Sequence, residues 1–358
     1  MFILHRSFRC LIIVLCMALI TSPACFAASD VNSKYANPDI SVNFLTLYQN
    51  GNRGNDVSSA FGEMNGFTLQ EAELQFFSDV DPYFRANILL SVSQSTPTSE
   101  FGIEPEEVFV ETTDLPNVTF KIGKFKAAFD RHNLMHTHAF PFIDAPLIDQ
   151  QLVGDSLDEV GVSAAALLPA DWFSEVTLQA LQGQNEILFG SPNRNSLASL
   201  LHLRNLWDLS DEVTMDWGMT GLCGANSYGN YTHVYGSDVT FKWQPLEGGK
   251  YRALNFTLEY LSGDIGGNPD GESLNGASTW VQYKFAEQWW AQARYDYVNP
   301  QGDNPAQSKE SYLVGYFPSE FSGFRLQYDH LDDGTKPAED KVSVQMNITI
   351  GAHPAHSY

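Results

Sequence analysis

Apolar and polar residues alternate without exception along the stretch Val342-Ser343-Val344-Gln345-Met346-Asn347-Ile348-Thr349-Ile350. Successive side chains of a β-strand point to opposite faces, so this stretch predicts a strand with one apolar and one polar face. The pattern recurs through most of the chain after residue 38. Sixteen such segments, each near the roughly ten residues that a tilted transmembrane strand needs, lie at about 39–48, 67–79, 83–93, 106–113, 118–126, 158–168, 173–183, 197–207, 212–223, 231–243, 251–262, 278–285, 289–298, 309–317, 321–331 and 341–350.

The connections between these segments tend to alternate between short and long. Seven short ones lie at 79–82, 114–117, 169–172, 208–211, 244–250, 286–288 and 318–320. The intervening connections are mostly longer and rich in Gly, Asn, Asp and Pro. An even strand count with this rhythm is typical of bacterial outer-membrane barrels, whereas a soluble sandwich, the alternative for alternating strands, has no reason to show it. We therefore predict an all-β fold, a 16-stranded antiparallel transmembrane β-barrel.

The N-terminal residues indicate how the chain reaches the membrane. Basic residues precede an apolar run at 11–20, and small residues lead up to Ala27. This order predicts a secretory signal peptide at 1–27, whose apolar run is too short for a spanning helix. A lipoprotein acceptor at Cys25 is the alternative. Residues 28–358 are then expected to form one barrel domain in the cell outer membrane.

The mature chain is strongly acidic, since the whole sequence carries a formal charge of -23 at pH 7. An acidic field repels nucleic acid and attracts cations, so nucleic-acid binding is excluded and a cation preference is predicted. Aromatic residues make up 13% of the chain, and many flank the short connections, as expected for girdles at the membrane interfaces. The expected partners are the lipid bilayer, lipopolysaccharide, the barrel-assembly machinery, and small solutes or ions.

The third of the long connections is the longest, at about 127–157. It contains Phe140, Phe142, Leu147 and Ile148, which gain about 25 cal/mol per Å² by leaving water. The lumen wall is the nearest surface that can cover them. We therefore expect this extracellular loop to fold inward and to form a constriction.

The start of this loop carries a family resemblance. Lys121-Ile122-Gly123-Lys124-Phe125-Lys126, followed by Phe129-Asp130-Arg131, resembles the strand-to-constriction segment of the phosphate-selective porin O and P family. The stretches 66–74 and 79–83 resemble a first hairpin of such porins. The resemblance implies a sixteen-stranded barrel, a homotrimer, and a third loop that sets selectivity.

Two features depart from that family. Its anion-selective members line the pore with a basic ladder, whereas the lysines here stand in an acidic protein. Residues 351–358 also extend past the last strand, and the His-Pro-Ala-His sequence at 353–356 is similar to barrel proteins labelled zinc-regulated outer-membrane receptors.

Charged residues at polar strand positions and in the third loop are the candidate pore residues. The expected constriction residues are Lys121, Lys124, Lys126, Asp130, Arg131, Asp144 and Asp149. The expected wall residues are Glu71, Glu73, Arg85, Arg204, Asp216, Glu259, Arg294, Asp296, Arg325 and Asp329. Charges of both signs across a pore make a transverse field that disfavours large apolar solutes. No nucleophile elbow or phosphate-binding loop is recognised, so we predict a passive channel for small hydrophilic solutes or ions and no enzyme.

Three histidines of the inward loop allow a second interpretation. His132, His136 and His138 lie near acidic residues in the sequence, and imidazole with carboxylate suits zinc. Their spacing is not a recognised closed zinc motif, and we favour the simpler explanation that these histidines form hydrogen bonds with the lumen wall. The alternative function is therefore a zinc-responsive or zinc-binding outer-membrane receptor or transport protein, with zinc as the cofactor; the channel needs none.

Overall fold

The structure is a computed structural model that describes residues 38–53, 65–94, 100–154, 156–190, 196–271 and 273–351. Its strands are β1 (Asp39–Gly51), β2 (Gly66–Asp79), β3 (Phe84–Gln94), β4 (Phe101–Thr112), β5 (Val118–Lys126), β6 (Asp158–Leu167), β7 (Phe173–Leu181), β8 (Ala198–Ser210), β9 (Val213–Ala225), β10 (Tyr231–Trp243), β11 (Ala253–Ile265), β12 (Ser273–Ala286), β13 (Trp289–Asn299), β14 (Gln307–Ser319), β15 (Ser322–Asp332) and β16 (Glu339–Gly351). The predicted signal peptide and the histidines of the C-terminal tail lie outside the described residues.

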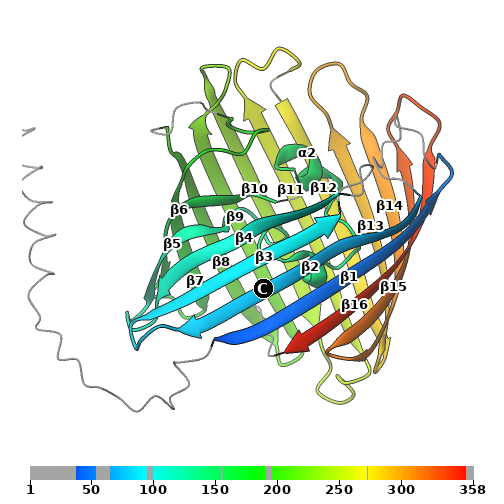
Figure 1. Cartoon of the computed structure of the whole chain (residues 1–358), viewed down its shortest axis with the longest axis horizontal. Coiled ribbons are helices and arrows are strands. Elements are labelled where there is room, and N and C mark those ends of the chain that lie inside the picture. The colour runs from blue at the N-terminus through cyan, green and yellow to red at the C-terminus, as the bar shows by residue number, and fades with distance from the viewer. Residues whose placement is uncertain are drawn as a thin grey trace, which may run out of the picture. The chain divides into compact units, whose positions relative to one another are not determined.

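The sixteen strands form one closed antiparallel barrel, drawn in Figure 1. Each strand pairs with its sequence neighbours, and β1 closes the barrel by pairing with β16 from Ser41↔Gly351 to Gly51↔Lys341. The prediction of a 16-stranded antiparallel barrel is confirmed. The seven predicted short connections join β2 to β3 and every second pair after it.

Two strands begin earlier than the sequence predicted. β4 starts at Phe101 and β12 at Ser273, each about five residues before the predicted start. In β4, Pro105 and a register shift interrupt the alternation. In β12, the early residues Gly276 and Ala277 are too small to show a hydropathy pattern. The pairing of neighbouring strands extends these segments where their own sequence gives no signal.

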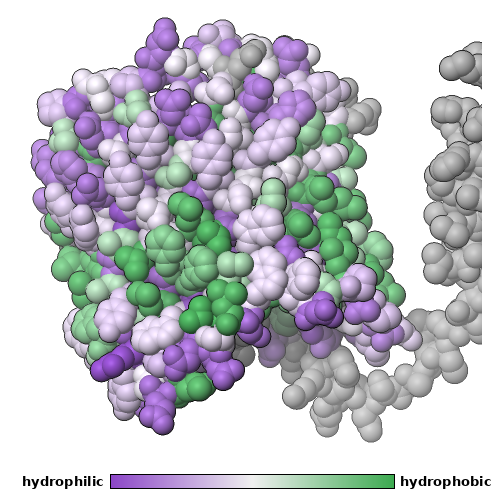
Figure 2. Space-filling model, turned by 180° about the vertical axis from the view of Figure 1, so that it is seen from behind, coloured by the Kyte–Doolittle hydropathy of each residue, from purple (hydrophilic) through white to green (hydrophobic). Residues whose placement is uncertain are grey.

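The two faces of the wall differ in polarity. In β11, Thr257 and Glu259 are buried toward the lumen while Leu258 is 44% exposed on the outside. Figure 2 shows apolar side chains gathered in a band on the outer surface, between more hydrophilic ends. A closed sheet with such a band satisfies all its backbone hydrogen bonds and can face hydrocarbon. None of the helices among the described residues is long and apolar enough to cross a bilayer.

Aromatic residues cluster beside the short connections, as the sequence predicted. The indole rings of Trp172 and Trp207 lie 6.0 Å apart between centroids, and those of Trp207 and Trp217 lie 6.3 Å apart. Trp289 contacts Tyr316 in the same way, at 4.7 Å. These rings sit where a girdle contacts the membrane interface.

The segment between β5 and β6 provides much of the buried apolar core. Phe129, Ile148 and Leu152 are fully buried in a cluster with inward-facing leucines and valines of β7 to β13. Helix α2 (Leu147–Leu152) packs close to Gly263 and Gly276, where an added Cβ would come within 2.6 Å of the Leu152 side chain and 3.0 Å of the Ile148 side chain. Part of the inner wall is therefore apolar, and glycines leave room for the helix.

The outward position of Leu258 generates a test of the membrane assignment. Leu258→Arg places a charge near mid-strand on the lipid-facing side and should cost roughly 2–4 kcal/mol of folding free energy. Gln282→Arg is the matched control, because Gln282 faces the lumen and contacts Gln292. The measurement is urea unfolding of both variants in lipid vesicles. Equal losses of stability would show that Leu258 does not face lipid.

Candidate functional site

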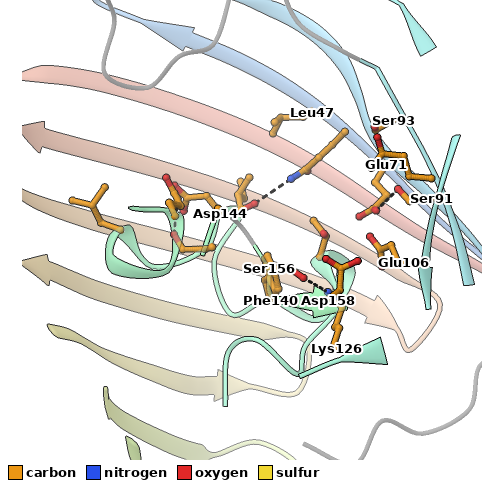
Figure 3. Close-up of a pocket in the computed structure, with 18 of the residues that line it drawn as sticks. Leu47, Glu71, Ser91, Ser93, Glu106, Lys126, Phe140, Asp144, Ser156 and Asp158 are labelled. Atoms are coloured by element: carbon orange, nitrogen blue, oxygen red, sulfur yellow. Dashed lines mark hydrogen bonds between the residues drawn. The ribbon is translucent and has the colours of Figure 1, made fainter. Parts of the chain in front are cut away.

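A cavity of about 510 Å³ lies between the segment 127–157 and the inner wall (Figure 3). The strands β14 to β16 and β1 to β6 form one continuous arc of wall around it, and the segment itself provides Phe140, Ile143 and Asp144. The charged residues that line the cavity are Glu71, Glu104, Glu106, Asp144 and Asp158 together with Lys124, Lys126, Lys309 and Lys341. The cavity is therefore polar and carries both signs of charge at close quarters.

Two register shifts bring extra polar side chains to this cavity. In the β1–β2 pairing Leu45 faces Glu71 and Thr46 faces Leu69, which leaves Gln70 as the inserted residue. In the β3–β4 pairing Glu106 is inserted in the same way, next to Pro105. A β-bulge redirects side chains, so two consecutive residues can both face the lumen. Glu106 and Gln70 thus gain lumen contacts that strict alternation would deny them.

The residues at the bulges hold the inserted segment. The Gln70 amide donates to the Ile143 carbonyl at 3.1 Å. Nδ1 of His136 lies 3.1 Å from Oε2 of Glu106, and its Nε2 lies 3.4 Å from Oε2 of Glu107. The bulged part of the wall therefore contacts the segment at two separate points.

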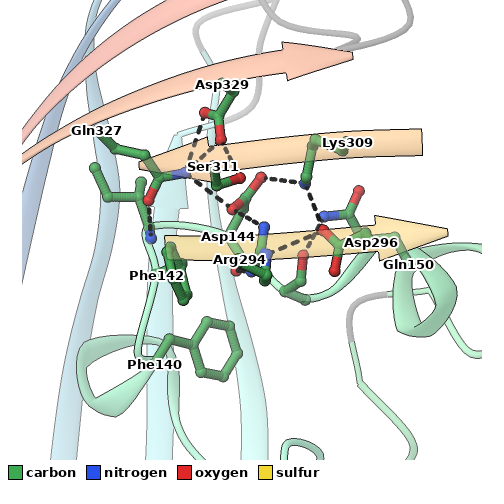
Figure 4. A network of polar contacts seen from close by, with 12 residues as sticks. Phe140, Phe142, Asp144, Gln150, Arg294, Asp296, Lys309, Ser311, Gln327 and Asp329 are labelled. Atoms are coloured by element: carbon green, nitrogen blue, oxygen red, sulfur yellow. Dashed lines mark hydrogen bonds and ion pairs between the residues drawn. The ribbon is translucent and has the colours of Figure 1, made fainter. Parts of the chain in front are cut away.

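A buried ion cluster, drawn in Figure 4, holds the segment against β13, β14 and β15. The Asp144 carboxylate accepts from Arg294 Nη2 at 2.7 Å, from Lys309 Nζ at 2.8 Å and from Gln327 Nε2 at 3.2 Å. Burial opposes ionisation of Asp144, but the charges of Lys309 and Arg294 outweigh it and hold the pKa of Asp144 well below its usual range. Asp144 is therefore a carboxylate that neutralises two buried cations of the wall.

Main-chain groups of the segment are bonded to the same wall. Arg325 Nη1 donates to the Phe140 carbonyl at 2.6 Å, and the Ile143 amide donates to Oε1 of Gln327 at 2.9 Å. The guanidinium of Arg294 also lies 4.6 Å from the centroid of the Phe142 ring, within the range of a cation–π contact. This stretch of backbone thus has specific partners on the barrel wall.

The other end of the segment is held by the opposite wall. Arg131 Nη1 donates to Oδ2 of Asp216 on β9 at 2.9 Å, and the Ala128 amide donates to Gln179 on β7 at 3.1 Å. In a closed barrel of sixteen strands, β7 and β9 lie across the lumen from β14 and β15. A segment that bonds to both sets of strands passes through the lumen between them.

The structure separates the predicted constriction residues into different groups. Lys124, Lys126 and Asp144 line the cavity. Lys121 lies 4.0 Å from Glu111 on the neighbouring strand. Asp130 and Asp149 lie outside the cavity lining, buried beside Glu259, and Arg131 pairs with Asp216.

The predicted wall residues are distributed around the lumen. Glu71 lines the cavity, and Glu73 contacts the His138 ring. Arg85 pairs with Asp79 at 2.9 Å beside a short turn. The remaining ones contact the segment, each other or, in the case of Asp329, the wall residue Gln327: Arg204, Asp216, Glu259, Arg294, Asp296, Arg325 and Asp329.

Sequence reasoning missed several lining residues. Lys309 and Lys341 occupy inward positions of alternating strands, and the strand pattern could have identified them. Glu106 could not be found in this way, because strict alternation places its side chain on the outer face and the bulge turns it toward the lumen. The connection between β7 and β8 was also overlooked, although Leu188 and Phe189 are buried in the apolar core of the lumen.

The three histidines of the segment have different surroundings. His136 and His138 are stacked with ring centroids 5.9 Å apart, and ligand atoms of His136, Glu73 and Glu106 lie within 4.8 Å of one another. Burial lowers the pKa of His136, but its contacts with Glu106 and Glu107 prevail and raise it to about 9. His132 instead lies 4.2 Å from the Phe140 ring, and burial lowers its pKa to about 3.

Comparisons with known proteins agree with this architecture. No family model matches the chain. An uncharacterized protein of Aquifex aeolicus is 29% identical over 346 residues, covering 83% of this chain and 72% of that protein. The outer membrane channel DcaP of Acinetobacter baumannii is similar in structure, with a TM-score of 0.60, 12% identity, and coverage of 88% of this chain and 98% of that one.

Two further solved structures show the same fold. A loop-deletion mutant of the outer membrane protein OmpT of Vibrio cholerae has a TM-score of 0.59 at 13% identity, covering 88% of this chain and 99% of that one. The anion-selective porin from Comamonas acidovorans has a TM-score of 0.57 at 8% identity, covering 87% and 98%. The chain therefore has the fold of porin-type outer-membrane barrels, and with its apolar outer band the predicted location in the outer membrane is confirmed.

The contacts of Asp144 predict a large effect of its removal. Asp144→Ala leaves Arg294 and Lys309 without their partner in the segment, and breaking a buried ion pair in this way costs roughly 3–5 kcal/mol. Glu310→Ala is the control, since that exposed carboxylate accepts a hydrogen bond from the Tyr312 hydroxyl and is not part of the ion cluster. The measurement is denaturant unfolding followed by tryptophan fluorescence. A loss for Asp144→Ala no larger than for Glu310→Ala would contradict the anchoring role.

Proposed function

We propose that this outer-membrane barrel is a passive channel for small hydrophilic solutes or ions. The observation that carries the proposal is the cavity of about 510 Å³ inside the lumen, lined by five acidic and four basic residues. Opposite charges facing each other across a pore orient water and polar solutes and disfavour large apolar ones. The segment 127–157 narrows the lumen and acts as the constriction in this proposal.

A preference for cations is part of the proposal. Among the buried charged residues of the described chain, twelve are acidic and five are basic. The whole sequence is also acidic, at -23. Such a field raises the local concentration of cations. We therefore do not propose anion selectivity for this chain, despite its resemblance to phosphate-selective porins.

Single-channel recording in planar bilayers tests the channel. Ser93 lines the cavity and points into it from β3, so Ser93→Trp should lower the conductance by filling part of the path. Val92→Trp, on the adjacent outward position, is the control and should leave the conductance unchanged. The reversal potential of the same channels in a potassium chloride gradient should indicate cation preference.

Two results would count against the proposal. Purified, correctly folded protein that shows no channel activity, or equal conductance of the Ser93→Trp variant and the wild type, would refute transport through this cavity. A reversal potential that indicates chloride preference at moderate salt would remove the cation preference alone, because wall charges dominate when screening is incomplete.

Zinc binding is the second candidate function, and one observation favours it. His136, Glu73 and Glu106 present ligand atoms within 4.8 Å of one another, and His138 contacts Glu73 beside them. One nitrogen ligand with carboxylate oxygens suits zinc. Zinc would have to displace the proton that His136 holds at neutral pH, because a pKa of about 9 keeps its imidazole charged. The structure separates His132 from this group.

Calorimetric titration with zinc tests this candidate. His136→Gln should abolish binding of one zinc ion per chain, while His132→Gln, a change of the same type outside the group, should leave it intact. Zinc binding that both variants retain, or that neither the wild type nor the variants show, would exclude this group as a zinc site.

A further inference from the structure

A second group of carboxylates lies in the lumen and is not part of the cavity lining. Asp130 at the start of the segment, Asp149 in α2 and Glu259 on β11 are each at most 2% exposed. Oxygens of the three residues lie within 4.8 Å of one another. Three negative charges in so little space repel each other strongly once water is removed. Cations, hydrogen-bond donors or bound protons must therefore offset this repulsion in the folded protein.

The side chains that the structure describes do not provide that compensation. Among the described residues, no Lys, Arg or His forms an ion pair with Asp130, Asp149 or Glu259. Nearby cations are engaged elsewhere, since Arg131 pairs with Asp216. This is the reverse of the arrangement around Asp144, where one carboxylate faces two cations.

Most oxygens of the group also lack a hydrogen-bond donor among the described residues. Five of the six carboxylate oxygens are buried without a donor: Oδ2 of Asp130, both of Asp149 and both of Glu259. The sixth, Oδ1 of Asp130, accepts from the Asn133 amide at 2.6 Å. Buried polar atoms without partners are rare in folded proteins, and a bound ion is one of the explanations for them. The five oxygens could all be satisfied by one cation that accepts their lone pairs.

The chemistry of these oxygens indicates which kind of cation they would bind, namely a hard one. All five of these unpaired atoms are carboxylate oxygens, which as ligands suit calcium or magnesium better than the softer transition metals. Calcium–oxygen distances are about 2.3–2.6 Å, so two ligands on opposite sides of a Ca²⁺ ion lie about 5 Å apart. The oxygens of the group lie within 4.8 Å of one another, close enough for all three residues to contact one such ion. Magnesium demands shorter distances and a stricter octahedron.

The neighbourhood adds further negative charge. Asp238 of β10 lies directly across from Glu259 in the strand register, and like charges at paired positions destabilise a sheet. Asp238 therefore adds to the repulsion that a bound cation would offset.

We propose that Asp130, Asp149 and Glu259 bind one Ca²⁺ ion, which ties the inserted segment to the barrel wall. The ion bridges two points of the segment, 19 residues apart, to β11 on the other side of the interface. It offsets the repulsion among the three carboxylates and fixes α2 next to the strand that carries Glu259. The site is separate from the histidine group and from the cavity.

Direct binding of calcium to the folded barrel tests the site. The full-length protein is solubilised in a neutral detergent, freed of lipopolysaccharide and metals with chelator, and dialysed against radioactive Ca²⁺. The wild type should bind one ion per chain, and Glu259→Gln and Asp149→Asn should each weaken binding at least tenfold. Glu111→Gln is the control, because it removes a carboxylate that lies beside Lys121 instead of in the group.

Thermal unfolding with and without Ca²⁺ provides a second readout, because an ion that binds only the folded protein raises its unfolding temperature. Calcium should raise the unfolding temperature of the wild type and of Glu111→Gln, and leave that of Glu259→Gln unchanged. If the group instead shares protons, the wild type will show no calcium dependence and Glu259→Gln will be more stable than the wild type at neutral pH, which would overturn the proposal. Equal binding by the wild type and both group variants would overturn it as well.

Discussion

Closure of the sheet is the constraint on which the rest of the structure depends. A strand within a bilayer has no water to satisfy its backbone N–H and C=O groups, so every strand must have two paired neighbours. The pairing of β1 with β16 meets this requirement. Once the sheet is closed, the alternation of each strand sorts its side chains between lipid and lumen. The apolar outer band and the charged interior are two results of the same pairing.

Closure of the sheet also creates a lumen, and the inserted segment fills only part of it. The segment between β5 and β6 occupies one part of the lumen with an apolar core around Phe129 and Leu152. Its other contacts are charge pairs and hydrogen bonds, such as that of Asp144 with Arg294. The apolar contacts exclude water from one side of the lumen, and the polar ones leave an open charged cavity on the other. The segment therefore fills one part of the lumen and lines the cavity in another.

Small irregularities of the sheet determine the chemistry of that cavity. The inserted residues Gln70 and Glu106 are redirected by bulges in two nearby strands, and both contact the segment. Pro105 can stand beside one of these bulges because the ladder is already interrupted there. Regular strands would have placed fewer polar groups opposite the segment. The strand register, through the bulges, thus determines which wall residues hold the segment.

The sequence by itself determined the number, order and approximate bounds of the strands, since alternation is a local property that each residue expresses independently of distant ones. It also indicated that residues 127–157 carry too much apolar surface to remain in water. Only the tertiary structure decided which lumen residues meet. Asp144 and Arg294 are 150 residues apart, Glu106 faces inward against its expected side, and His136 lies among carboxylates while His132 contacts Phe140. These contacts arise across the lumen, where closure and strand register, and not the local sequence, set the distances.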